Sequence, residues 1–295
     1  MSCEGARMAD QSAGRVSLHP CFPQGLWTAY TEITGEGGTP ALFCLQAQNG
    51  ESQMTDKELR DEQAKIDAFV MQQAKKHGLV TKDIEPIFDG IADENAYLSS
   101  KMKVAWILKE PYDDFDKDGN PCGGGWSLVK DCFINHDENW VTIDGRKLWK
   151  NPVWQKIAYI MYGFRHGLKW EEMDWIHDHP SMMDEIKSIA WINLSKMPAG
   201  TNSSSGWFRY YYDRIWKDVV QKQIDVYNPD VLIFANTFHC FCLPNKAELK
   251  KVDRSSNDWV GHYRMGNKWI LDTYHPGRKG GDYVNAVIGA LNACC

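Results

Sequence analysis

The chain has 295 residues, of which 43% are hydrophobic and 12% aromatic, enough to bury the core of one large α/β domain or two small ones. Its formal net charge of −6 gives no long-range attraction to nucleic acid or to an anionic membrane, so a nucleic-acid site has to be a local basic patch. No apolar run approaches the roughly 20 residues of a membrane span, and no apolar segment follows a basic N-terminus. We therefore expect a cytoplasmic protein with no membrane partner.

Residues 1–53 mix Gly, Ser, Thr and Gln with scattered aromatic residues and show no sustained period. This composition predicts an irregular or partly disordered extension. The first clear element follows at residues 54–78, where Thr55 and Glu58 form a capping box and Gly78 ends a helix. One face of this helix is apolar and carries Leu59, Ile66, Phe69 and Val70.

From residue 100 onward, short apolar runs alternate with helical stretches. The runs cover residues 103–108, 188–193, 230–235 and 268–274. Two helices between them are expected at 151–163, with Asn151 as cap and Gly163 as stop, and at 212–227, ended by Asn228 and Pro229. A third is expected in the basic stretch 245–258, as a solvated face.

Near-continuous apolar strands that alternate with helices indicate a parallel sheet covered on both faces. We therefore predict an α/β fold in residues 54–295, as a single three-layer domain with a central, mainly parallel four-stranded sheet flanked by helices. In such a sheet, ligands bind beyond the carboxyl ends of the strands. Those ends deliver Glu110, Asn193 and His275, and Pro111 stiffens the turn behind the glutamate.

Metal binding has little support in the sequence. The nine cysteines form no C-x-x-C pair, which favours a reduced chain. His239, Cys240 and Cys242 are close enough in sequence to hold a metal, but no second ligand pair stands at a useful spacing, and alternation along an extended segment explains them as well. We predict no metal site.

Four short motifs together resemble the uracil-DNA glycosylase superfamily. "ILKEPYDD" is similar to the family's first motif, with Glu110 at the position of the catalytic aspartate and Tyr112 at that of the tyrosine. "GGGWSL" places Trp126 where a ring stacks on the base, "AWINLSKMPAGTNSSS" places Asn193 where an asparagine reads it, and "ILDTYHPGR" places His275 at the catalytic histidine. The motifs keep the family's chain order and span residues 103 to about 290.

The chain departs from the family pattern at two motifs. Leu108 and Lys109 precede the carboxylate where the family has a glycine, and glutamate is one methylene longer than aspartate. A shift of about 1 Å in a catalytic group can cost on the order of a hundredfold in rate, so the surrounding loop has to compensate. Gly277 replaces a serine, and the DNA-binding contact to phosphate is expected from Arg278 and Lys279 instead.

The resemblance implies a monofunctional DNA glycosylase that leaves an abasic site and needs neither a metal nor an organic cofactor. Asn193 would bind the edge of a flipped pyrimidine, Trp126 would stack on it, and Tyr112 would pack near its C5 atom. Glu110 and His275 would be the catalytic residues: the histidine donates to the pyrimidine O2 and the glutamate orients water.

The partner is then single- or double-stranded DNA with a target base, and no obligatory protein partner is evident. The target is uracil, or a bulkier base such as the hydroxymethylated or glucosylated cytosine of some phage DNA. The role is repair or anti-phage defence accordingly. Two alternatives stay open: a catalytically inactive nucleic-acid-binding member of the same fold, and a hydrolase of free nucleosides. Each site residue also has a plain structural explanation, as a turn, a loop hydrogen-bonder, a cap or a core aromatic.

Overall fold

The computed structural model describes residues 17–20, 27–30, 54–120, 122–199, 212–241, 249–252, 259–277 and 279–295. Internal contacts divide the chain into two units, Met1–Gln53 and Met54–Cys295. In the first unit, β1 (Ser17–Pro20) and β2 (Trp27–Tyr30) pair as antiparallel strands. The composition of this segment predicts no regular structure, so the strand pair is a feature that the sequence analysis misses.

The second unit is built on one mixed sheet, which among the described residues has seven strands in the order β3-β5-β4-β6-β9-β8-β7. Four neighbouring parallel strands form its centre: β5 (Ala190–Asn193), β4 (Val104–Leu108), β6 (Val231–Ala235) and β9 (Lys268–Thr273). These are the four strands that the apolar runs predict, and the α/β class is confirmed. The predicted size is wrong, because the sheet is larger and mixed.

Three antiparallel strands extend the sheet beyond its predicted edges. β3 (Gly90–Ile91) pairs with β5, while β8 (Val260–Met265) pairs with β9 and β7 (Lys250–Lys251) pairs with β8. None of them has a continuous apolar run: β3 and β7 have two residues each, and only Val260 and His262 of β8 are buried. The helix expected at 245–258 is wrong, since Lys250 and Lys251 form a strand.

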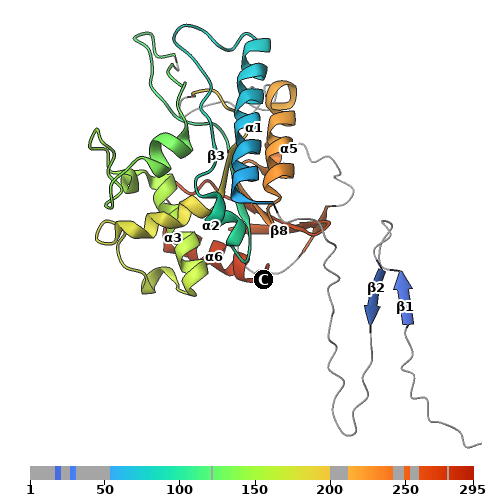
Figure 1. Ribbon diagram of the computed structural model, residues 1–295. Helices are drawn as coiled ribbons and strands as arrows, with labels where there is room; N and C mark the ends of the chain where they lie inside the picture. The colour runs from blue at the N-terminus through green and yellow to red at the C-terminus, as the bar shows by residue number, and fades with distance from the viewer. Residues whose placement is uncertain are drawn as a thin grey trace, which may run out of the picture. The chain divides into compact units, whose positions relative to one another are not determined.

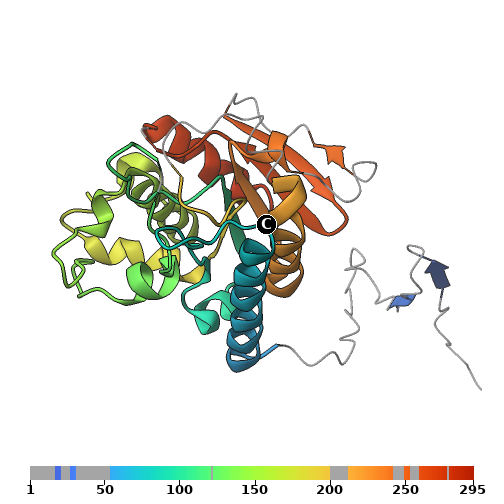
Figure 2. The same cartoon turned by 90° about the horizontal axis from the view of Figure 1, so that it is seen from above.

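Helices cover both faces of this sheet (Figures 1 and 2). One face carries α1 (Asp56–Lys76) and α5 (Lys217–Tyr227), which pack side by side and whose predicted caps are confirmed. The other face carries α3 (Pro152–His166) and α6 (Gly281–Asn292), and α2 (Glu94–Ser99) contacts α1. Short π-helical or 3-10 segments complete the described chain: η1 (Leu128–Ile134), η2 (Leu148–Lys150), η3 (Trp170–Glu172), η4 (Pro180–Ser188), η5 (Tyr212–Trp216) and η6 (Phe238–Cys240).

The core therefore has two halves, one on each side of the sheet. Side chains of a strand alternate between its faces, and β4 shows this clearly: Val104, Trp106 and Leu108 pack under α3 and α6, whereas Ala105 and Ile107 pack under α1 and α5. In the described ranges, no helix combines the length and the apolar character that a membrane crossing requires.

Gly163 does not end α3, contrary to the prediction. The helix continues to His166, and Gly167 ends it in the left-handed conformation at φ 68°. Gly163 is instead a close-packing position between α3 and α6. A Cβ atom added to it would lie 2.5 Å from Ile288 Cδ1 and 2.8 Å from the carbonyl oxygen of Leu168.

Replacing Gly163 with alanine is expected to lower the free energy of unfolding by about 1–3 kcal/mol, the usual cost of overpacking a core. Gly289→Ala in α6 is the matched control, because its Cβ meets no atom within 4 Å. That variant is expected to gain about 0.5–1 kcal/mol, since glycine inside a helix is less stable than alanine. Urea denaturation measures both values, and equal stability of the two variants would contradict the proposed packing role.

Candidate functional site

The carboxyl edge of the four parallel strands brings together residues that are far apart in sequence. The strand order β5-β4-β6-β9 puts three site residues at the carboxyl ends of one parallel group: Asn193 ends β5, Glu110 follows β4 and His275 follows β9. The chain moves from β4 to one side to form β5 and then to the other side to form β6. Ligands of open α/β sheets bind at such a change of direction.

The three side chains are directed to the same face of the sheet. Leu108 and Trp191 belong to the core under α3 and α6, and Glu110 and Asn193 lie two residues after them. The alternation continues past β4, because the backbone stays paired with the segment after β5: Ser195 N–H donates to the Lys109 carbonyl (2.9 Å).

His275 lies on this side as well. Two residues before it, Thr273 contacts the Tyr283 hydroxyl of α6. The turn after it packs on the first turn of α3, since a Cβ added to Gly277 would lie 3.5 Å from Val153 Cγ2. Three strand spacings of about 4.8 Å, roughly 14 Å in all, separate β5 from β9. The carboxyl ends of β4 and β6 lie between those of β5 and β9, so the site residues are spread along this part of the edge.

Glu110 is nearly buried, with 9% of its side chain exposed, and it has a cationic neighbour. The Lys109 Nζ atom lies 3.6 Å from Glu110 Oε1, and 28% of the Lys109 side chain is exposed. In the sequence, Lys109 is only a departure from the family motif, whereas in the structure its ammonium lies at this edge beside Glu110.

His275 is held in the neutral form with a defined tautomer. Partial burial, followed by the positive charges of Lys279 and Lys109, lowers the pKa of His275 below its ordinary value of 6.5. The Gly277 N–H donates to His275 Nδ1 at 3.3 Å. We infer that the ring proton resides on Nε2, which makes this atom a hydrogen-bond donor at neutral pH.

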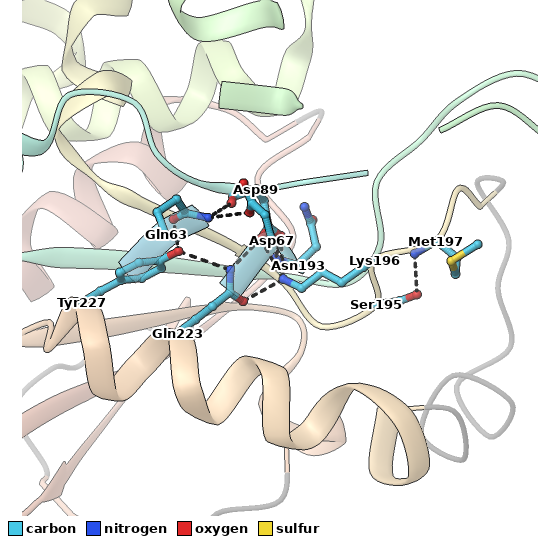
Figure 3. A network of polar contacts seen from close by, with 9 residues as sticks. All are labelled: Gln63, Asp67, Asp89, Asn193, Ser195, Lys196, Met197, Gln223 and Tyr227. Carbon is cyan, nitrogen blue, oxygen red and sulfur yellow. Dashed lines mark hydrogen bonds and ion pairs between the residues drawn. The ribbon is translucent and has the colours of Figure 1, made fainter. Parts of the chain in front are cut away.

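Asn193 is buried to 3% exposure, and its backbone and side chain differ in their contacts. The backbone N–H donates to Asp89 Oδ2 at 2.6 Å, and no contact is drawn to the side chain in Figure 3. Within the described residues, the buried Nδ2 atom has no hydrogen-bond partner. An unsatisfied buried donor of this kind costs about 1–3 kcal/mol. A ligand with an acceptor oxygen or nitrogen would remove that cost.

Trp126 is fixed by a carboxylate from the first motif. Its Nε1–H donates to Asp113 Oδ2 at 2.7 Å, and the Gly124 N–H donates to the same oxygen at 2.8 Å. Gly124 is needed for a reason inside the protein, because its φ is +83° and an added Cβ would lie 1.8 Å from the carbonyl oxygen of Glu85. Asp113 thus links the "PYDD" and "GGGW" segments.

The remaining predicted residues lie at the rim of this edge. Tyr112 is 62% exposed and meets Phe115 edge-on at 5.9 Å between ring centroids. The Lys279 ammonium lies 4.8 Å from the centroid of the Tyr274 ring and 5.4 Å from that of Trp259. Arg278 lies outside the described residues.

Asn236 is a candidate that the sequence analysis misses. It follows β6, which lies between β4 and β9, so it stands between Glu110 and His275 along the edge. Its φ of 58° is left-handed, and its N–H donates to the Thr273 carbonyl at 2.7 Å. The sequence does contain a pattern that indicates a site residue here: Asn236 comes at the end of an apolar run, as Asn193 does.

Comparison with protein-family models and with curated proteins finds no match for this chain. Among the described residues, no group of three His, Cys, Asp or Glu side chains is placed to hold a metal ion, and Cys242 lies outside them. The function has to be argued from the side chains of the sheet edge.

We expect an NMR titration of His275 to have its midpoint below 6.5. Lys279→Met should move the midpoint up, and Lys109→Met should move it up by less, because each removes a positive charge that disfavours the imidazolium. The folded state holds this proton less tightly than the unfolded chain, so its contribution to stability rises with pH between the lowered pKa and 6.5. Midpoints that stay unchanged in both variants would contradict this electrostatic coupling.

Proposed function

We propose that the chain is a monofunctional DNA glycosylase, which hydrolyses the N-glycosidic bond of a flipped pyrimidine and leaves an abasic site. One observation carries the proposal: a buried carboxamide without a partner for Nδ2, Asn193, lies on the same face of one sheet edge as the Glu110 carboxylate and the neutral His275 imidazole. The resemblance of four motifs to the uracil-DNA glycosylase superfamily supports the same assignment.

Recognition of the base falls to Asn193. A carboxamide offers a donor and an acceptor side by side, which matches the Watson-Crick edge of a pyrimidine. The target has to leave the helical stack first, at a cost of about a few kcal/mol. Trp126, held by Asp113, supplies an indole ring for stacking on the extruded base.

Bond cleavage makes the departing base anionic and the sugar cationic. The Nε2–H of His275 donates to the pyrimidine O2 as charge develops, a preorganised contact typically worth about 3 kcal/mol in comparable sites. The Lys109 ammonium adds positive charge on the side of the leaving base. Glu110, beside Lys109, orients the attacking water and stabilises the sugar cation, as carboxylates do in glycoside hydrolysis.

The identity of the base depends on the room around its C5 atom. Tyr112 would exclude large substituents if it were packed inward, but most of its side chain is in solvent. This exposure supports a pyrimidine that carries a C5 group, such as hydroxymethylated or glucosylated cytosine, beside uracil as the family's default. A modified cytosine would make the role anti-phage defence, and uracil would make it DNA repair.

An alkali-cleavage panel tests the proposal. Labelled single- and double-stranded oligonucleotides that hold uracil, mismatched thymine, hydroxymethylcytosine or glucosylated hydroxymethylcytosine are incubated with the protein and then treated with alkali. We expect strand breaks at one or more of these bases. Glu110→Gln and His275→Ala should each lower the cleavage rate by about 100-fold or more, the usual contribution of a positioned acid or base.

Glu62→Gln and His166→Ala serve as matched controls. Glu62 lies in the first half of α1, and His166 is the last residue of α3, whose first turn is the part that packs beside His275. Breaks that persist in both site variants would refute the catalytic assignment. Binding to DNA without breaks on any substrate would favour the catalytically inactive alternative. Release of a base from free nucleosides alone would favour the nucleoside hydrolase.

A further inference from the structure

A fully buried lysine lies directly behind the candidate site. Lys196 has no exposed surface, and its ammonium donates to both carboxylate oxygens of Asp89 and to Gln223 Oε1, each at 2.8 Å (Figure 3). Asp89 is 3% exposed and accepts a further hydrogen bond from Gln223 Nε2 at 2.7 Å. The two charged residues come from the segment before β3 and the segment after β5.

Stability of the fold does not account for this pair. Removing two charges from water costs nearly as much as their attraction returns, and well-packed apolar residues in their place are often neutral or stabilising. Burial lowers the pKa of Lys196, and the charge of Asp89 opposes that shift. The attraction to Asp89 therefore offsets only part of the free energy lost when the ammonium is removed from water. A specific role is the better explanation for such a pair.

The pair sits where the backbones of the site segments meet. Asp89 Oδ2 accepts the Asn193 N–H at 2.6 Å, and the Lys196 carbonyl accepts the Ile87 N–H at 2.7 Å. Between them, Leu194 and Ser195 donate to the carbonyls of Leu108 and Lys109, next to Glu110. The Phe88 N–H, in turn, donates to the Trp126 carbonyl at 3.0 Å.

A second group of side chains holds Asp89 from the helices on the other face. Gln63 Nε2 donates to the Asp89 carbonyl at 3.0 Å and to Asp67 Oδ1 at 2.8 Å, and the Tyr227 hydroxyl donates to Gln63 Oε1 (Figure 3). Gly90 makes room for Gln63, since an added Cβ would lie 2.1 Å from its Oε1. α1 thus holds the backbone of Asp89, and α5 holds the carboxylate that accepts from Asn193.

We propose that Asp89 and Lys196 are positioning residues of the base-reading site: Lys196 orients Asp89, and Asp89 fixes the backbone of Asn193 so that its carboxamide points at the base. This inference rests on the proposed function. It assigns the buried pair to specificity and rate, with little effect on the stability of the fold.

Two double variants separate positioning from folding. Asp89→Leu with Lys196→Met removes both charges and leaves the Asn193 N–H without an acceptor. Asp89→Asn with Lys196→Met removes the same charges but retains a carboxamide oxygen that can accept from Asn193. Tyr97→Phe is the control, because it deletes a buried hydrogen bond to the Tyr227 carbonyl (3.0 Å) without touching Asp89.

Three readouts are taken for each variant: the thermal midpoint, the hydrogen-exchange rate of the Asn193 amide by NMR, and kcat and KM on the oligonucleotide that the wild type cleaves. We expect the leucine variant to lose no more thermal stability than Tyr97→Phe does, since each leaves one buried backbone group without its partner. It should exchange the Asn193 amide at least about 10-fold faster and lose about 100-fold in kcat, the usual cost of a misplaced group. The asparagine variant should restore most of the slow Asn193 exchange and most of the kcat. Tyr97→Phe should change the midpoint alone.

Unchanged Asn193 exchange and kcat in the leucine variant would overturn the inference, as would loss of kcat in proportion to lost stability in all three variants. Exchange does not depend on catalysis. A wild type that cleaves no substrate therefore ends the proposed function, whereas the exchange rates still decide whether the pair positions Asn193.

Discussion

The ammonium of Lys196, fully buried against Asp89, is the constraint on which the arrangement of the segments around the candidate site depends. A buried charge without a partner costs several kcal/mol, comparable with the whole stability of a domain. The lysine therefore forces Asp89 into the core, and the carboxylate in turn needs donors for its lone pairs. Those donors come from Asn193, Lys196 and Gln223. The segment before β3, the segment after β5 and helix α5 are thereby drawn to one point.

The carboxyl edge of the sheet uses this constraint to combine side chains that differ in chemistry. Each parallel strand delivers one group, and the segment after β5 binds the segment after β4 through its backbone, so the strand ends cannot move independently. Charge is distributed along the edge as well. The carboxylate of Glu110 has Lys109 beside it, and the same lysine together with Lys279 keeps His275 neutral. Burial and these local charges together let a carboxylate and a neutral donor stand at one edge.

Features that depend on a few adjacent residues are predicted well from the sequence. Features that depend on contacts between residues far apart in the chain are not. The capping box of Thr55, the Asn151 cap and the central strands follow from a few adjacent residues, and all are present. The outer strands were missed because edge strands are short or only half buried. Gly163 was misread because its reason, the approach of Ile288, comes from another helix. Lys196 and Asp89 are 107 residues apart, and nothing near either residue predicts burial.

The placement of charge also bears on how an acidic protein would take up DNA. The net charge of −6 and the exposed Asp114, Asp116 and Asp118 close to Tyr112 weaken attraction to phosphates. Positive charge near the site comes from Lys109 and Lys279. If the chain is a DNA glycosylase as proposed, phosphate contacts contribute little of the free energy that is needed to extrude a base. The interactions inside the site then have to offset the cost of unstacking the base. Bases that are already unpaired or weakly stacked would be extruded most easily, so discrimination by Asn193 and Trp126 would operate on bases that leave the helix readily.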